Sequence, residues 1–164
     1  MARLLAPPPT SALELVLVGH EAWRRDLYPD SKGLLTIGVG RNIEARGLAD
    51  DEVAYLLHND MGRVVHELAA GWPWTARLDP VRQIVLLDML FNLGLARFSK
   101  FAPTLAVIAA GRYAEAAARL RRTPWYGQVA TRAVRLTTML ETGRWPTDLP
   151  RSSLLPSLPV VPSR

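Results

Sequence analysis

The sequence contains no cysteine. This absence excludes a disulfide framework and any catalysis by a thiolate. A chain of 164 residues, 49% of them hydrophobic, is long enough to bury a core without such cross-links. The composition therefore fits one ordinary domain that folds in a reducing cytosol.

A long apolar run is also absent. The run LELVLV near the N-terminus is far shorter than the roughly 20 apolar residues that a membrane-spanning helix needs. The segment before it has one early arginine, three consecutive prolines and no small-residue cleavage site. We therefore expect neither a signal peptide nor a transmembrane segment, and we expect synthesis in the cytoplasm.

Metal and cofactor motifs are missing as well. His20, His58 and His66 form neither an HExxH pattern nor a close ligand pair, so we expect no metal ion. The string GVGRNI resembles the start of a dinucleotide fingerprint but lacks its third glycine. We therefore expect no cofactor.

The sequence does carry an excess of positive charge. Its 20 Lys+Arg against 15 Asp+Glu give a formal net charge of +5, which favours a polyanionic partner. Nucleic acid, anionic lipid and the acidic polymers of a bacterial envelope all fit that description. A late arginine cluster supports a nucleic-acid-binding helical module as one alternative, although a solvated basic face is the commoner meaning of such a cluster. It consists of Arg119, Arg121, Arg122, Arg132 and Arg135.

The hydrophobic pattern is mostly helical. Ser11 followed by Glu14 is typical of a capping box, and apolar residues at helical spacing predict a helix from about Ser11 to Leu27. Turn residues at 28–33 and the alternation of Leu35, Ile37 and Val39 then predict a short β-hairpin with one apolar face.

The rest of the pattern predicts helices. A long amphipathic helix begins at Asp50, and a buried helix begins at Asp79-Pro80 and ends near Gly94. Shorter helices are predicted at about 102–110, 113–120 and 129–141. These elements predict a mostly α, α+β fold in which a long helix joins a small helix-plus-hairpin lobe to a larger helical lobe, with a ligand cleft between the lobes. We expect a folded domain at 11–146, between a flexible N-terminal segment at 1–10 and a proline-rich flexible tail at 147–164.

Two carboxylates and a hydroxyl lie close together in the small lobe. Glu21 is expected at the edge of an apolar helix stripe, where desolvation favours a protonated carboxyl, and Asp30 in a polar turn that favours an ionised one. Thr36 lies on the hairpin face that carries glycines, which leaves room for a ligand. Such a pair of carboxyls suits the cleavage of a glycosidic bond. From spacing alone, an exposed helix glutamate and an Asx-turn aspartate are the commoner meaning.

The residues around this pair resemble a known family. Glu21, Tyr28, Asp30, Gly33 and the string TIGVG at 36–40 are similar to the catalytic segment of the T4-type phage lysozymes, which are glycoside hydrolases of family 24. Later matching strings keep the family's order: Phe91-Asn92-Leu93-Gly94, Trp125-Tyr126-Gly127-Gln128, Arg132, Arg135, Thr142-Gly143 and Trp145. The resemblance covers about residues 11 to 146 and implies a lysozyme-like fold with a catalytic domain over that range.

The resemblance also implies the chemistry. Glu21 would be the general acid, Asp30 would position or activate the attacking water, and Thr36 would hold that water from the opposite side, giving inversion at the anomeric carbon. The substrate would be the β-1,4-linked muramic acid and glucosamine backbone of peptidoglycan. The protein would act as a monomeric bacteriophage endolysin that reaches the cell wall through a holin or another membrane lesion, with no nucleic-acid partner.

Further binding residues follow from the same resemblance. Phe91 and Thr104 match positions in the far wall of the cleft, and Arg132 matches an arginine near the catalytic glutamate. Asn42 and Arg119 occupy cleft positions where the side chain differs from the family's.

Two positions depart from the family's pattern. Ala22 and Arg41 stand where many members have glycine and histidine. The replacement of the histidine removes a side chain that could pair with an acidic residue of the long helix.

A lytic transglycosylase is the alternative within the enzymes. Such enzymes use a lone glutamate and need no second carboxylate to activate water. The presence of Asp30 and Thr36 therefore favours hydrolysis.

Overall fold

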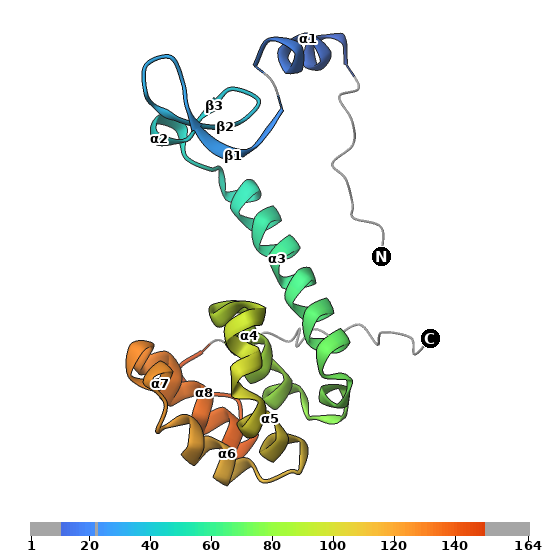
Figure 1. Cartoon of the computed structure of the whole chain (residues 1–164), viewed down its shortest axis with the longest axis vertical. Helices are drawn as coiled ribbons and strands as arrows, with labels where there is room; N and C mark the ends of the chain where they lie inside the picture. Colours follow the sequence, from blue (N-terminus) through green and yellow to red (C-terminus); the bar gives the residue numbers. More distant parts are fainter. Residues whose placement is uncertain (1–10, 22, 150–164) are drawn as a thin grey trace. The chain divides into compact units, whose positions relative to one another are not determined.

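The computed structural model describes residues 11–21 and 23–149 of the chain (Figure 1). These residues form a mostly helical α+β fold with one small antiparallel sheet, which confirms the predicted fold class. The chain divides into two units, and the division between Tyr55 and Leu56 falls inside the long helix α3 (Asp50–Gly71). The predicted flexible segment at 1–10 lies outside the described residues, as do residues 150–164 of the flexible tail predicted at 147–164, and Ala22.

The first element that the structure describes in the first unit is helix α1 (Ala12–Glu21). Its start is the predicted capping box: the Ser11 backbone N–H donates to Glu14 Oε2 at 2.8 Å, and the Glu14 N–H donates to Ser11 Oγ at 3.1 Å. The two hydrogen bonds satisfy backbone donors that the first turn of a helix leaves without intrahelical partners.

The predicted helix from Ser11 to Leu27 is wrong beyond Glu21. Strand β1 (Arg24–Pro29) replaces its last part and pairs antiparallel with β2 (Leu35–Gly38). The periodicity that suggested a longer helix could not reveal this pairing, because the ladder draws its hydrogen-bond partners from residues about ten positions further along the chain.

The sheet has the strand order β1-β2-β3, and its third strand was not predicted. Strand β3 (Arg41–Asn42) pairs with β2 and leads directly into the short helix α2 (Ile43–Arg46). The predicted hairpin is present, but burial does not follow its predicted apolar face. Thr36 is only 3% exposed, whereas Leu35 on the predicted apolar face is 39% exposed. Thr36 lies in the central strand, paired with Tyr28 on one side and Asn42 on the other.

The second unit holds the remaining helices. They are the main part of α3, η1 (Pro73–Arg77), α4 (Pro80–Phe98), η2 (Ser99–Phe101), α5 (Ala102–Ala109), α6 (Tyr113–Leu120), α7 (Pro124–Gln128) and α8 (Ala130–Thr142). The predicted start of α3 is confirmed, as are the bounds of α5, α6 and α8 to within about two residues, whereas α7 was not predicted. Asp79 caps α4 as expected, accepting a hydrogen bond from the Arg82 N–H at 3.1 Å. Gly94 interrupts the helical geometry with φ +69°, but α4 resumes and ends at Phe98 rather than near Gly94.

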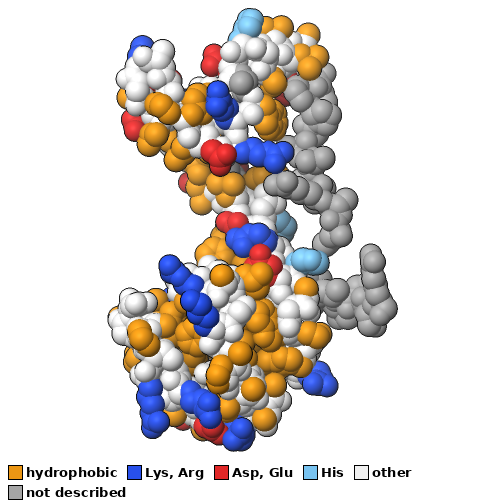
Figure 2. All heavy atoms as spheres, in the orientation of Figure 1, with side chains coloured by type: hydrophobic (Ala, Val, Ile, Leu, Met, Phe, Trp, Pro, Cys, Tyr) orange, Lys and Arg blue, Asp and Glu red, His pale blue; other side chains and the backbone are white. Residues whose placement is uncertain are grey.

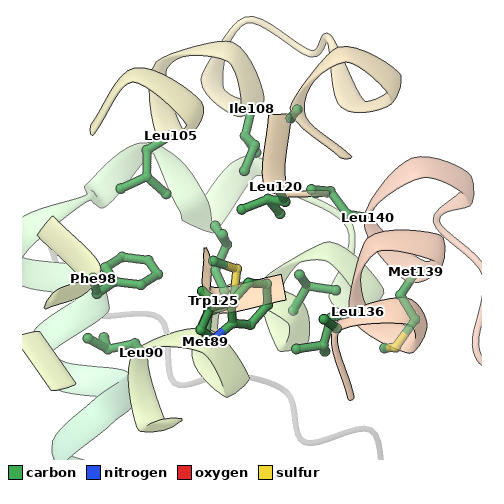
Figure 3. Packing of buried hydrophobic residues seen from close by; sticks show 14 of the residues in the cluster. Met89, Leu90, Phe98, Leu105, Ile108, Leu120, Trp125, Leu136, Met139 and Leu140 are labelled. Carbon is green, nitrogen blue, oxygen red and sulfur yellow. The ribbon is translucent and has the colours of Figure 1, made fainter. Parts of the chain in front are cut away.

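The buried hydrophobic cluster lies in this second unit. Within the described chain it begins at Val64, and it contains side chains from α3 through α8 (Figure 3). Met89 and Trp125 lie at its centre, between Phe98 on one side and Leu136 and Leu140 on the other. Trp125 also donates from Nε1 to Asn92 Oδ1 at 3.1 Å, so the strings FNLG and WYGQ meet in space.

None of the helices in the described ranges combines the length and the apolar character that crossing a membrane requires.

Candidate active site

Glu21 is the last residue of α1, and its side chain lies against the turn between β2 and β3. A Cβ atom built on Gly40 would lie 2.8 Å from Glu21 Oε2 and 2.9 Å from its Cδ. Real Cβ contacts are essentially never this short, so any larger residue at position 40 would force the end of the Glu21 side chain to move. The Gly40 φ of +67° favours glycine independently.

The Glu21 carboxyl is exposed. The expected desolvation beside an apolar stripe is not observed, because α1 has no buried residue. Over residues 11–21 and 23–149, Glu21 takes part in no hydrogen bond or ion pair with another side chain. Its carboxyl therefore faces solvent without a protein partner in this part of the chain.

Asp30 closes the turn between β1 and β2. Its Oδ1 accepts hydrogen bonds from the N–H groups of Lys32 at 2.8 Å and Leu34 at 2.9 Å, and its own N–H donates to Leu34 O at 2.9 Å. This is the Asx turn that the segment YPDSKG predicts. The described residues offer no hydrogen bond to the other oxygen, Oδ2, so a half-buried carboxylate is fixed at one oxygen and available at the other.

Thr36 lies in the central strand of the sheet. It is paired with Tyr28 on β1 and Asn42 on β3, and its Oγ1 donates to Leu34 O at 3.2 Å. Its burial contradicts the open hairpin face that the sequence predicted. Asn42 caps α2, because its Oδ1 accepts from the Ala45 N–H at 2.9 Å. Asn42 Oδ1 therefore already accepts a hydrogen bond from the first turn of α2.

The other candidate residues lie in the second unit. Phe91 on α4 is 45% exposed, whereas Thr104 on α5 is only 7% exposed and presents little surface to a ligand. Arg132 on α8 donates from Nε to Asp88 Oδ1 at 2.7 Å. The sequence analysis missed Asp88, although an acidic residue inside the apolar run IVLLDMLFNL was a signal that could have identified it.

A second missed interaction involves Arg41, one of the two positions at which the sequence departs from the pattern of the family that it resembles. Arg41 Nη1 pairs with Glu52 Oε1 on α3, so an acidic residue of the long helix does find a basic partner on β3. The Ala49 backbone N–H and then the Arg41 guanidinium lower the pKa of Glu52 below its ordinary value.

The late arginine cluster is largely neutralised within the second unit. In Figure 2, Lys and Arg side chains lie along the lower margin of this unit. Four of the five cluster arginines form ion pairs: Arg119 with Glu115, Arg121 with Glu141, Arg132 with Asp88, and Arg135 with Asp148. These carboxylates offset charge that phosphate binding would use, which weakens the nucleic-acid alternative.

The described residues contain no group of three or more His, Cys, Asp or Glu side chains arranged to hold a metal ion.

The comparison with known protein families includes the segment that carries the three proposed catalytic residues. The family described as Phage lysozyme matches residues 18–135, most of the chain, including Glu21, Asp30 and Thr36. The chain belongs to the phage lysozyme family. As a member of this family it is a glycoside hydrolase of the lysozyme type.

Similar proteins agree with this family. Probable T4-type lysozyme 2 of Dictyostelium discoideum is 25% identical, over 81% of this chain and 95% of that protein. Probable T4-type lysozyme 1 of the same organism is 22% identical over the same shares. The pre-baseplate central spike protein Gp5 of Enterobacteria phage T4 is 25% identical over 82% of this chain but only 28% of its own length. The family sequence is therefore found both in whole proteins of similar extent and within a longer phage protein.

Proposed function

We propose that this chain is a bacteriophage endolysin that hydrolyses the β-1,4 bond between N-acetylmuramic acid and N-acetylglucosamine in peptidoglycan, with inversion, to lyse the host cell. Membership of the lysozyme family supports the class of reaction. The observation that carries the assignment of the site is the position of Glu21, an exposed carboxyl placed against a glycine turn. In the same unit, Asp30 is a second carboxylate that the backbone holds in place.

The proposed mechanism uses each group according to its surroundings. Glu21 donates a proton to the leaving glycosidic oxygen, and the free Oδ2 of Asp30 receives a proton from the attacking water. The Thr36 hydroxyl donates to Leu34 O, so its oxygen keeps acceptor capacity for that water. Attack from the face opposite the leaving group inverts the anomeric carbon.

The same proposal also includes how the enzyme reaches the cell wall. The enzyme acts as a monomer on peptidoglycan glycan strands and uses neither a metal ion nor another cofactor. It is made in the host cytoplasm and depends on a holin or another membrane lesion to reach the wall.

Replacement of the proposed acid tests this function. Glu21→Gln keeps the size and polarity of the side chain but removes the transferable proton, so activity on purified murein should fall by about 10² to 10⁴. Turbidity clearance of murein measures the rate, and a thermal melt establishes that the variant is folded. Near-native turnover by the folded variant would disprove the role of Glu21.

Glu14→Gln is the matched control on the same helix. Glutamine also serves at this position of a capping box, so the change should cost about 1 kcal/mol or less in stability and leave the rate unchanged.

A further inference from the structure

The contact between Gly40 and Glu21 makes the position of the proposed acid depend on the β2–β3 turn. Atoms Oε2, Cδ and Cγ of Glu21 all lie 2.8–3.0 Å from the place where a Gly40 Cβ would be. The end of the Glu21 side chain therefore occupies the space beside Gly40 that a larger side chain would fill, so the position of this turn sets the room that the carboxyl has.

The residue after Gly40 fixes this turn to the rest of the unit. Arg41 Nε donates to Gly47 O at 3.1 Å, in the connection between α2 and α3, and Arg41 Nη1 pairs with Glu52 Oε1 in the first turn of α3. The same Glu52 carboxyl accepts from the Ala49 N–H through Oε2 at 2.7 Å. The Arg41 side chain thus joins strand β3 to two segments that follow it.

The guanidinium group is suited to this task. Its planar donors reach two acceptors on different segments at once, whereas a lysine ammonium is a single point charge on a flexible stem. The Arg41 and Glu52 side chains are 28% and 35% exposed, so the pair is partly shielded from solvent. Backbone pairing of Ile37 with Arg41 adds a connection to the central strand.

We infer that Arg41, held by Glu52 and the Gly47 carbonyl, is a positioning residue for the proton donor Glu21 and acts through Gly40. This inference rests on the proposed function, because it assigns Arg41 a purpose only if Glu21 delivers the proton. A misplacement of a reacting group by about 1 Å can lower the rate by about 100-fold. The position of Gly40 is therefore part of the catalytic geometry, although Arg41 itself does not touch the substrate.

The test compares kcat and KM for Arg41→Met, Arg41→Lys and Glu52→Gln on soluble, uncrosslinked murein glycan, well below each variant's melting temperature. Arg41→Met should lower kcat by about 10- to 100-fold and leave KM within about twofold, because substrate contacts are unchanged. Arg41→Lys and Glu52→Gln should each lower kcat by a smaller factor, because each keeps part of the linkage. Glu52→Gln decides the question if Arg41→Met does not fold.

Arg63→Met is the matched control. Arg63 also pairs with carboxylates on α3, Asp60 at 3.2 Å and Glu67 at 3.4 Å, but lies in the other unit and has no link to Gly40. Its kcat should be unchanged. A lower melting temperature with unchanged kcat in the Arg41 and Glu52 variants would overturn the inference and leave a structural role only. If Glu21→Gln is inactive while these variants keep kcat, the inference fails and the proposed function stands.

Discussion

Gly40 offers the sharpest residue-level test of the site geometry. An alanine at this position would meet two obstacles, the φ of +67° and the Glu21 carboxyl 2.8 Å from the new Cβ. Gly111, between α5 and α6 in the second unit, has φ +74° with nothing within 4 Å of its Cβ position, so Gly111→Ala carries the backbone strain alone. Left-handed backbone costs an alanine about 1–2 kcal/mol.

We therefore expect both variants to lose about that much stability, and only Gly40→Ala to lose activity, by about tenfold or more. Chemical denaturation and murein clearance measure the two effects. Equal activity of the two folded variants would show that the Gly40 contact does not position Glu21.

Residues with local signals could be predicted from the sequence, and residues defined by tertiary contacts could not. The segment YPDSKG predicts the Asx turn of Asp30, because the hydrogen bonds of this turn join residues that are neighbours in sequence. The contacts of Gly40 with Glu21 and of Arg41 with Glu52 join residues 11 or more positions apart. The central place of Thr36 in the sheet similarly depends on β3, a strand of two residues with no sequence pattern of its own.

At the scale of elements, Arg82 joins three helices of the second unit. Its guanidinium donates to Asp79 Oδ2 at 2.7 Å, to Leu140 O at 2.8 Å and to Glu141 O at 3.1 Å, and its Cζ lies 3.7 Å from the Tyr113 ring centroid. The start of α4 and the end of α8 are thereby held together beside α6. Only the Asp79-Pro80 start of this arrangement was visible in the sequence.

The Asp79–Arg82 pair predicts a pH dependence of stability. Burial raises the pKa of Asp79, but hydrogen bonds from the Arg82 side chain and N–H outweigh it, so the net pKa lies below the ordinary value. A carboxyl with a lowered folded-state pKa stabilises the fold above its unfolded pKa of about 3.9 and loses this effect as the pH falls through the folded value.

Asp79→Asn keeps a capping side chain but removes the charge. Since the Asp79 side chain is 37% exposed, the variant should be less stable by only about 1 kcal/mol or less at pH 7. Urea unfolding should show this difference shrinking as the pH falls below about 4. A difference that stays constant down to pH 2 would contradict the ionic contribution.

Prediction of the elements succeeded where one segment carries its own boundary signals. Acidic residues at the start of α3, and Gly143 in the left-handed C-cap of α8 with φ +66°, are such signals. The end of α1 at Glu21 has none, because the apolar spacing continues through Trp23 and Leu27 into a strand. The ladder with β2 overrides that local pattern.

At the scale of the whole molecule, we propose residues 11–146 as the catalytic domain, and the contacts after Trp145 give this boundary a test. Asp148 pairs with Arg135 on α8, and Trp145 Nε1 donates to Leu149 O at 3.4 Å. A chain that ends at Leu149 keeps both contacts and should retain full activity on isolated murein. A chain that ends at Trp145 loses both, and it should melt at a lower temperature while keeping kcat. Loss of kcat in the folded longer truncation would place an essential element beyond Leu149.

The most direct test of the central claim is the identity of the first product. Soluble, uncrosslinked murein glycan is digested in ¹⁸O-labelled water, and the early products are analysed by mass spectrometry and by NMR of the new anomeric centre. Hydrolysis by Glu21 and Asp30 with inversion predicts ¹⁸O-labelled reducing muramic acid ends that form first as the α anomer. Unlabelled anhydro-muramic ends would show a transglycosylase, and labelled ends that form first as the β anomer would show retention. Either result would contradict the mechanism proposed for this chain.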